Sequence, residues 1–286
     1  MKCIESCLIY GPSGAGKTTQ AEELAKFVAP RAVRLISASG GGWSSINASV
    51  ELGMVKPLWV PDFQFPFEAF ERLSQGWWPV NGKLVPPKDQ EDWDQVGGLF
   101  FEGLKEGCDL LMRNAVRREA NKEIKIAGQA ISVSFRDGET TYGAPAMGHF
   151  GAIQNHIENC VSNSKNLEGK YIVWTSLELK AADDNTRMPL YGPDVIGKAK
   201  TSVAPAWFDD CLHLHYVQQA GKAATRRMYL QSHFESDGIP YAAKNRGHRL
   251  APLPEYLEGA DLSLGVFLKK IQESHAKAKQ LLQGGK

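Results

Sequence analysis

The sequence lacks several features that mark membrane proteins, secreted proteins and zinc-finger proteins. No apolar run approaches the roughly 18 residues that cross a bilayer, and the N-terminal residues do not have the layout of a signal peptide. The five cysteines are odd in number and include no C-x-x-C pair, which favours reduced thiols over disulfides or a zinc site. These absences predict a cytoplasmic protein without a membrane partner.

The chain also lacks a surplus of charge of either sign. Its 286 residues include 33 Lys and Arg against 32 Asp and Glu, which gives a formal net charge of +1. A surface for nucleic acid must therefore come from local clustering. The one marked basic surplus, six Lys and Arg against two acids, lies in residues 218–250, where it indicates either such a surface or a solvated edge.

The most informative stretch that is present is residues 11–18, which fit the phosphate-binding pattern G-x-x-x-x-G-K-[ST]. An apolar run precedes it and a helical pattern follows it, as this loop requires. Its glycines let backbone N–H groups turn toward phosphates, Lys17 reaches the β and γ oxygens, and the Thr18 hydroxyl ligates Mg²⁺. We therefore predict binding of ATP and Mg²⁺. The predicted nucleotide-binding residues are Gly11, Pro12, Ser13, Gly14, Ala15, Gly16, Lys17, Thr18 and Thr19.

Apolar runs alternate with helical patterns along the chain, as in a parallel sheet covered by helices. The predicted strands are 7–10, 33–38, 58–60, 96–104, 171–176, 212–217 and 226–230, and the predicted helices are 17–28, 45–52, 66–75 and 149–161. A hairpin is expected at 77–85, an insert at 121–148 with one exposed strand at 131–135, and a long loop at 177–210. We divide the chain into a core, 1–254, and a C-terminal helical segment, 255–286.

Two strand ends carry polar side chains suited to nucleotide chemistry. P-loop NTPases hold Mg²⁺ or its water with an acidic residue at the end of a neighbouring strand, so Glu102 is the candidate for that role. The other interpretation of Glu102 is the first exposed residue after a buried strand. Thr175 ends another apolar run, where its hydroxyl either senses the γ-phosphate or simply closes the strand.

A pair of histidines, His213 and His215, lies on one face of the predicted strand 212–217. Because the sequence does not indicate a third ligand, packing or hydrogen bonding of these histidines is favoured over binding of a metal. In the preceding loop, acids such as Glu178 cancel the charge of the bases, so the loop's charge does not establish contact with DNA.

The order of the motifs resembles phage-type ATP-binding proteins with a RecA-like core, some of which are grouped with phage single-strand annealing recombinases. The resemblance spans roughly residues 6–249, and only the P-loop is highly specific. The motifs that carry it are, after the P-loop, Glu102-Gly103-Leu104, Trp174-Thr175-Ser176, Gly197-Lys198, Trp207-Phe208-Asp209 and Lys244-Asn245-Arg246.

This resemblance implies an α/β, RecA-like P-loop NTPase fold, with a mostly parallel sheet flanked by helices, an insert and a C-terminal helix. It also implies Mg-ATP hydrolysis by a homo-oligomer, ring or filament, acting on single-stranded DNA in phage recombination or replication in the host cytoplasm. In RecA-like rings and filaments a Lys-x-Arg element reaches the γ-phosphate of the neighbouring subunit, and Lys244 and Arg246 match it.

One departure from the family concerns the attacking water. The family often has a glutamate just after the second strand, where this chain has Ser39, which cannot act as a general base. Hydrolysis is then slow, or it uses Glu102 or another carboxylate. Two alternatives stay open: a nucleoside monophosphate kinase-like phosphotransferase, whose loop residues 11–17 also resemble, and a non-hydrolysing nucleotide-gated scaffold.

Overall fold

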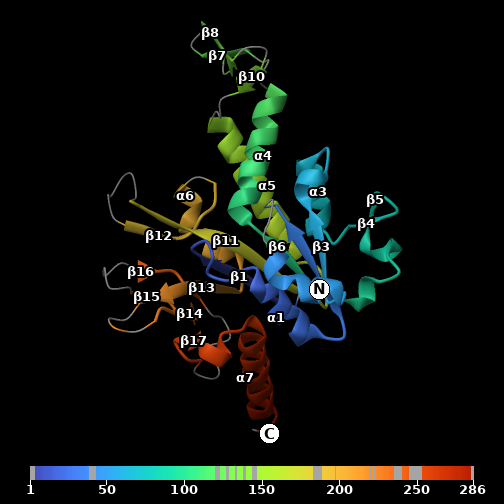
Figure 1. The fold of residues 1–286 in the computed structure, drawn as a ribbon, viewed down its shortest axis with the longest axis vertical. Helices are drawn as coiled ribbons and strands as arrows, with labels where there is room; N and C mark the ends of the chain where they lie inside the picture. The colour runs from blue at the N-terminus through green and yellow to red at the C-terminus, as the bar shows by residue number, and fades with distance from the viewer. Residues whose placement is uncertain are drawn as a thin grey trace.

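The structure is a computed structural model in which one large sheet carries helices on both faces (Figure 1). The fold class that the sequence predicts, α/β with a mostly parallel sheet flanked by helices, is confirmed. The residues described are 4–38, 43–119, 123–126, 129–132, 134–137, 140–143, 147–182, 189–196, 198–218, 221, 223–234, 240–244 and 253–284.

The central sheet has nine strands among the described residues. Eight follow the order β17-β14-β13-β1-β11-β6-β2-β3, and β12 pairs with β11. The bounds are β1 Glu5–Gly11, β2 Ala32–Ser37, β3 Val55–Trp59, β6 Val96–Glu102, β11 Tyr171–Ala182, β12 Pro189–Pro193, β13 Asp210–Val217, β14 Thr225–Tyr229 and β17 Tyr256–Glu258. Strands β13 to β3 are parallel, whereas β14, β17 and β12 are antiparallel. The carboxyl ends of the parallel strands therefore meet at one edge, where α/β folds bind their ligands.

Helices cover both faces of this sheet. The bounds are α1 Thr19–Val28, α2 Asn47–Glu51, α3 Pro66–Ser74, α4 Leu104–Glu119, α5 Met147–Ser164, α6 Lys198–Thr201 and α7 Leu264–Gly284. Helices α1 and α7 share one apolar core, and α3, α4 and α5 share the other. Strand β1 supplies both cores: Cys7 and Ile9 point to the first, Leu8 and Tyr10 to the second, as the two-residue period of a strand requires.

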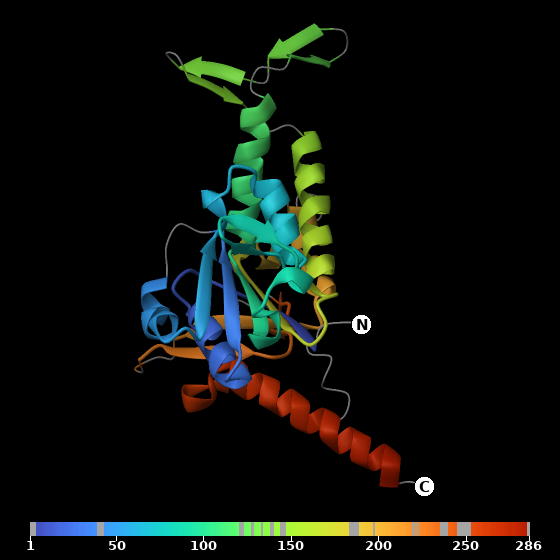
Figure 2. The same ribbon diagram turned by 90° about the vertical axis from the view of Figure 1, so that its right-hand side faces the viewer.

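The predicted insert forms two hairpins. They are β7 Glu123–Ile126 with β8 Gln129–Ser132, and β9 Ser134–Asp137 with β10 Thr140–Gly143. Figure 2 shows them beyond the end of α4, on the opposite side of the molecule from α7. The single strand predicted at 131–135 is wrong, because these residues divide between β8 and β9 and residue 133 lies outside the described residues.

Three other segments differ from the sequence prediction. Helix α4 was not predicted, and the expected loop at 177–210 is instead occupied by the extension of β11, by β12 and by α6. The segment from residue 255, expected to be helical, begins with β17, which pairs with β14 in the main sheet. The division of the chain at 254 stays a prediction.

The remaining strands are β4 Trp78–Val80, β5 Lys83–Val85, β15 His233–Phe234 and β16 Pro240–Tyr241.

Candidate nucleotide site

The phosphate-binding loop connects β1 to α1 at the carboxyl edge of the sheet. Gly14 and Gly16 have φ angles of 78° and 94°, the left-handed region that favours glycine. A Cβ atom on Gly16 would also lie 2.9 Å from the Arg226 guanidinium. The Thr19 hydroxyl donates to the Gly16 carbonyl at 2.6 Å and closes the turn before the helix. The predicted loop thus has the backbone that its sequence pattern requires.

Lys17 points back along the loop. Its Nζ donates to the carbonyl oxygens of Gly11 and Pro12, at 2.8 Å each. Burial lowers the pKa of the Lys17 ammonium, and the charges of Glu106, Glu178 and Glu102 oppose that change. The cation is therefore held inside the loop, facing acids on two neighbouring strands and a helix.

Glu102 lies at the end of β6, directly beside the loop. The Thr18 hydroxyl donates to its Oε1, and the Ser37 hydroxyl of β2 donates to its Oε2 at 2.8 Å. The residue is only 8% exposed, so it is not the exposed strand-end residue of the other interpretation. A hydroxyl and a carboxylate held together in this way offer the hard oxygen ligands that Mg²⁺ prefers.

A cavity of about 410 Å³ opens at this point. Eight of the residues singled out from the sequence line it: Ser13, Gly14, Gly16, Lys17, Thr18, Thr19, Glu102 and Thr175. Its volume falls within the range of about 300–1,000 Å³ that is usual for small-molecule sites. The full lining is Ser13, Gly14, Gly16, Lys17, Thr18, Thr19, Ser45, Glu102, Gly103, Glu106, Thr175, Ser176, Leu177 and Arg226.

Glu106 is another charged residue that lines the cavity, together with Lys17, Glu102 and Arg226. The sequence did not single it out. It lies in the first turn of α4, one turn after Gly103, whose φ of 85° redirects the chain from β6 into the helix. Its Oε2 atom is buried and has no hydrogen-bond partner among the described residues. The signal that would have found it is the helical spacing of the fully buried Leu104, Cys108 and Leu111.

Thr175 and Ser176 hold the neighbouring turns in place. The Thr175 hydroxyl oxygen accepts a hydrogen bond from the Gly103 N–H at 3.1 Å, and the Ser176 hydroxyl donates to the Asp194 carbonyl at 2.5 Å. Thr175 therefore fixes the β6–α4 turn while it lines the cavity. Its contact with a γ-phosphate stays a prediction.

Arg226 reaches the cavity from β14 of the same chain. Its Nε donates to the Tyr216 hydroxyl at 3.1 Å, and that hydroxyl donates to the Gly14 carbonyl at 2.8 Å. The guanidinium carbon lies 5.2 Å from the centre of the Tyr216 ring. A cation is thus tethered to the P-loop within the chain. The sequence places Arg226 in the predicted strand 226–230 and in the basic surplus at 218–250, but does not indicate its contact with the loop.

The predicted Lys-x-Arg element is described only in part, because Arg246 lies outside the described residues, as does Ser39. The Lys244 Nζ donates to the carbonyl oxygens of Pro205 and Phe208, at 3.0 and 2.7 Å. Lys244 therefore secures the chain before β13 in its own subunit. Action of the pair on a neighbouring subunit stays a prediction.

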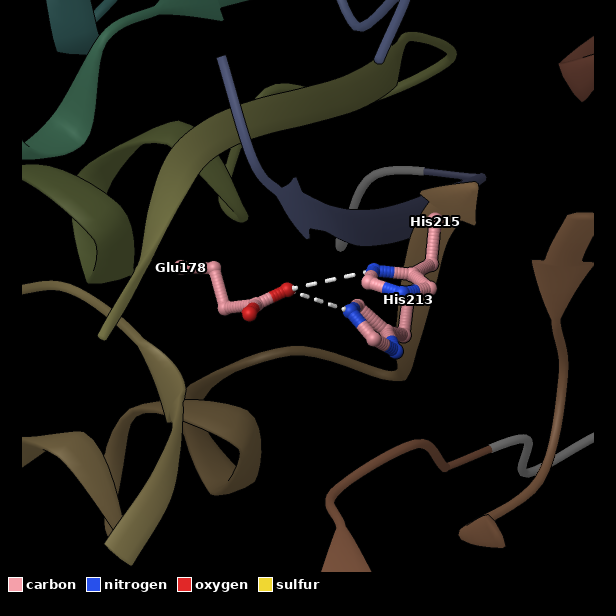
Figure 3. A group of neighbouring side chains, drawn as sticks. All are labelled: Glu178, His213 and His215. Atoms are coloured by element: carbon pink, nitrogen blue, oxygen red, sulfur yellow. Dashed lines mark hydrogen bonds and ion pairs between the residues drawn. The ribbon is translucent and has the colours of Figure 1, made fainter. Parts of the chain in front are cut away.

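The two histidines of β13 meet an acid of β11. Figure 3 shows both imidazole rings pointing toward the Glu178 carboxylate. Burial alone would raise the pKa of Glu178, but the hydrogen bond with His213 and the nearby His215 and Lys180 hold that pKa well below its usual range. Burial lowers the pKa of His213. The sequence did not reveal this third polar partner, which is 35 residues from His213 in the chain.

Comparisons with known proteins give matches among solved structures alone. No family model matches the chain, and no curated protein matches it. The flagellar accessory protein FlaH from Methanocaldococcus jannaschii is 9% identical, with 79% of this chain and 76% of that one covered and a TM-score of 0.36. The RadB recombinase is 12% identical, with coverage of 82% and 84% and a TM-score of 0.40. An ATPase from the type III secretion system of pathogenic bacteria is 10% identical, with coverage of 73% and 51% and a TM-score of 0.35.

The fold and the loop geometry define the architecture of a P-loop nucleotide-binding protein: the loop joins a central parallel strand to a helix, with a buried acid on a nearby strand. Among the described residues, no helix is both long enough and apolar enough to cross a membrane.

Proposed function

We propose that this chain is a RecA-like ATPase that binds and hydrolyses Mg-ATP. The observation that carries the proposal is the meeting of Lys17, Thr18 and Glu102 in one cavity at the carboxyl edge of the sheet. Thr18 and Glu102 would hold Mg²⁺, and Lys17 would neutralise phosphate charge. A bound Mg²⁺ supplies further neutralisation of the charge that develops on the phosphates.

Glu106 is the carboxylate that we propose as general base. Ser39 lacks a proton-accepting group, and Glu102 already accepts hydrogen bonds on both of its oxygens. In contrast, Glu106 presents a buried Oε2 without a partner among the described residues and lines the same cavity. A positioned base contributes about 10²- to 10⁴-fold to such a reaction.

The finer proposal is action on single-stranded DNA, in phage recombination or replication, by a homo-oligomer. It is supported by the order of the sequence motifs and by the basic surplus at 218–250. Arg246 would then act on ATP held by the next subunit.

The test is ATP consumption by the purified chain with and without single-stranded DNA, and then with nucleoside monophosphates. Lys17→Ala removes the phosphate-neutralising charge and should abolish turnover. Lys26→Ala is the matched control, because Lys26 is an exposed lysine of α1, the helix that follows the loop, and pairs only with Glu22 and Glu23 among the described residues. Turnover by Lys17→Ala at the rate of the unaltered chain would refute the proposal.

The same assay separates the two alternatives. Transfer of phosphate to a nucleoside monophosphate, with no response to DNA, would indicate the kinase-like phosphotransferase. Nucleotide binding without turnover under every condition would indicate the non-hydrolysing scaffold.

A further inference from the structure

The cluster of Glu178, His213 and His215 occupies a special position beside the P-loop. Strand β1 lies between β11 and β13, and Tyr10 pairs with both Ser176 and His213. β1 then leaves the sheet after Gly11, while its two neighbours continue. The cluster therefore connects β11 to β13 close to the position where β1, the strand between them, ends.

The three side chains approach one another closely enough to share an ion. The Nε2 of His213 lies 2.8 Å and the Nδ1 of His215 lies 3.7 Å from Oε2 of Glu178, and the three potential ligand atoms lie within 4.8 Å of one another. In a tetrahedral zinc site with bonds of about 2.0–2.1 Å, ligand atoms are separated by about 3.3 Å. The first contact must therefore lengthen, and the second shorten, by about half an ångström, and the two imidazole nitrogens, which lie within 4.8 Å of one another, must come to about 3.3 Å.

Neighbouring side chains fix the orientation of His213 and Glu178. On the far side of the His213 ring, Nδ1 faces Nε2 of His233 at 3.3 Å. The Lys180 ammonium lies 3.0 Å from Oε1 of Glu178, which leaves Oε2 toward the histidines. Metal-ligating histidines and carboxylates use such outer partners to fix ring orientation and ligand geometry.

Burial encloses two of the three side chains almost completely. The side chains of His213 and Glu178 are 0% and 3% exposed, whereas that of His215 is 14% exposed. His215 is the most exposed of the three side chains, so a fourth ligand such as water would lie beside it. Two imidazoles and one carboxylate suit zinc and similar transition metals, whereas Mg²⁺ selects sites made of oxygen.

We propose that Glu178, His213 and His215 bind one divalent transition-metal ion, with zinc as the preferred ion. Such an ion would cross-link β11 to β13 over the end of β1. That position matters for the P-loop, because Gly11 packs so closely on β13 that a Cβ atom would lie 1.9 Å from the Leu214 carbonyl. The ion site shares no ligand with the cavity of Lys17 and Glu102, so the proposal does not depend on ATP hydrolysis.

The experiment uses the full chain, treated with a chelator and free of nucleotide. It is titrated with Zn²⁺ by calorimetry and with Co²⁺ by visible absorption. We expect one equivalent of Zn²⁺ and the intense visible bands of low-coordinate Co²⁺. Glu178→Gln, which preserves size, and His215→Ala should each weaken Zn²⁺ binding by at least about 100-fold, since even loss of an outer partner costs about 10- to 100-fold.

Two control variants locate the ion. His275→Ala removes an exposed histidine of α7, and Glu102→Gln alters the nucleotide cavity; both should bind Zn²⁺ like the unaltered chain. Thermal melting of the chelated proteins checks that each variant is folded. The proposal is overturned if the chain and Glu178→Gln take up Zn²⁺ equally, or if Glu102→Gln loses the ion and Glu178→Gln keeps it.

Discussion

Replacing Glu106 by glutamine isolates the proposed general base, because the amide keeps the shape of the side chain and cannot accept the proton. The buried Oε2 makes no hydrogen bond with the described residues, so the substitution breaks no hydrogen bond of that atom with them. Loss of a base worth about 10²- to 10⁴-fold raises the activation free energy by about 2.7 to 5.4 kcal/mol. Glu106→Gln should therefore slow hydrolysis at least about 100-fold.

Nucleotide affinity should change far less than the rate. Glu106→Gln removes a charge that raises the pKa of Lys17 against the larger effect of burial, but it leaves Lys17 and Thr18, the proposed contacts to phosphate and Mg²⁺, in place. Single-turnover hydrolysis of labelled ATP measures the chemical step, and displacement of a fluorescent ATP analogue measures binding.

Asp109→Asn is the matched control for Glu106→Gln. Asp109 belongs to the same helix, but its side chain is 47% exposed and pairs with Lys105 at 2.6 Å, outside the cavity lining. It should hydrolyse ATP at the unaltered rate. Single-turnover rates of Glu106→Gln and Asp109→Asn that agree within about threefold would refute the assignment of Glu106, since a base is worth far more.

Three further predictions concern subunit contact, DNA and stability. Lys17→Ala and Arg246→Ala should each be inactive, and the loss of turnover for Arg246→Ala should be about 10³- to 10⁵-fold. Mixing the two variants should restore turnover if Arg246 acts on the neighbouring subunit. Mixed assemblies that do not recover turnover would exclude action of Arg246 on the neighbouring subunit. Affinity for single-stranded DNA should fall as salt rises, with a logarithmic slope of about 0.7 per phosphate contact, and a flat salt profile would contradict phosphate contacts. Arg34→Met should lower the free energy of unfolding in urea by about 2 to 3 kcal/mol, because it removes a fully buried guanidinium and leaves the half-exposed Asp92 without that partner. Arg72→Met, at an exposed pair, should lower it by less than about 1 kcal/mol. Equal losses for these two arginine variants would show that the burial of Arg34 is not what stabilises the fold.

The sequence was most informative where local chemistry dictates the backbone. The P-loop glycines need left-handed φ angles, and Gly14 and Gly16 have them. Asn81 and Gly82 have φ angles of 50° and 75°, and they form the two-residue turn of the hairpin expected at 77–85. In each case the signal lies within a few consecutive residues, so no distant contact was needed to interpret it.

The sequence was least informative where pairing between distant segments decides the structure. β11 continues past Leu177 because its polar extension pairs with β12, and residues such as Glu178 and Lys180 do not form the apolar run of a buried strand. Helix α4 follows β6 after the single residue Gly103, so its apolar positions merged with the strand pattern. The missed Glu106 and the missed contact of Glu178 with His213 both follow from these two errors.

Strand β11 carries residues of both the nucleotide cavity and the histidine cluster, and so connects the two sites directly. Thr175 lines the nucleotide cavity, and three residues later Glu178 lies in the histidine cluster. The charge of Glu178 acts on Lys17, whose pKa it raises against the effect of burial. A cation in the cluster would offset that charge, which removes one effect that keeps Lys17 protonated, and would itself attract phosphate oxygens, so binding of metal and of nucleotide should be coupled. Because such coupling is reciprocal, bound nucleotide must change the affinity for metal by the same factor by which the metal changes the affinity for nucleotide.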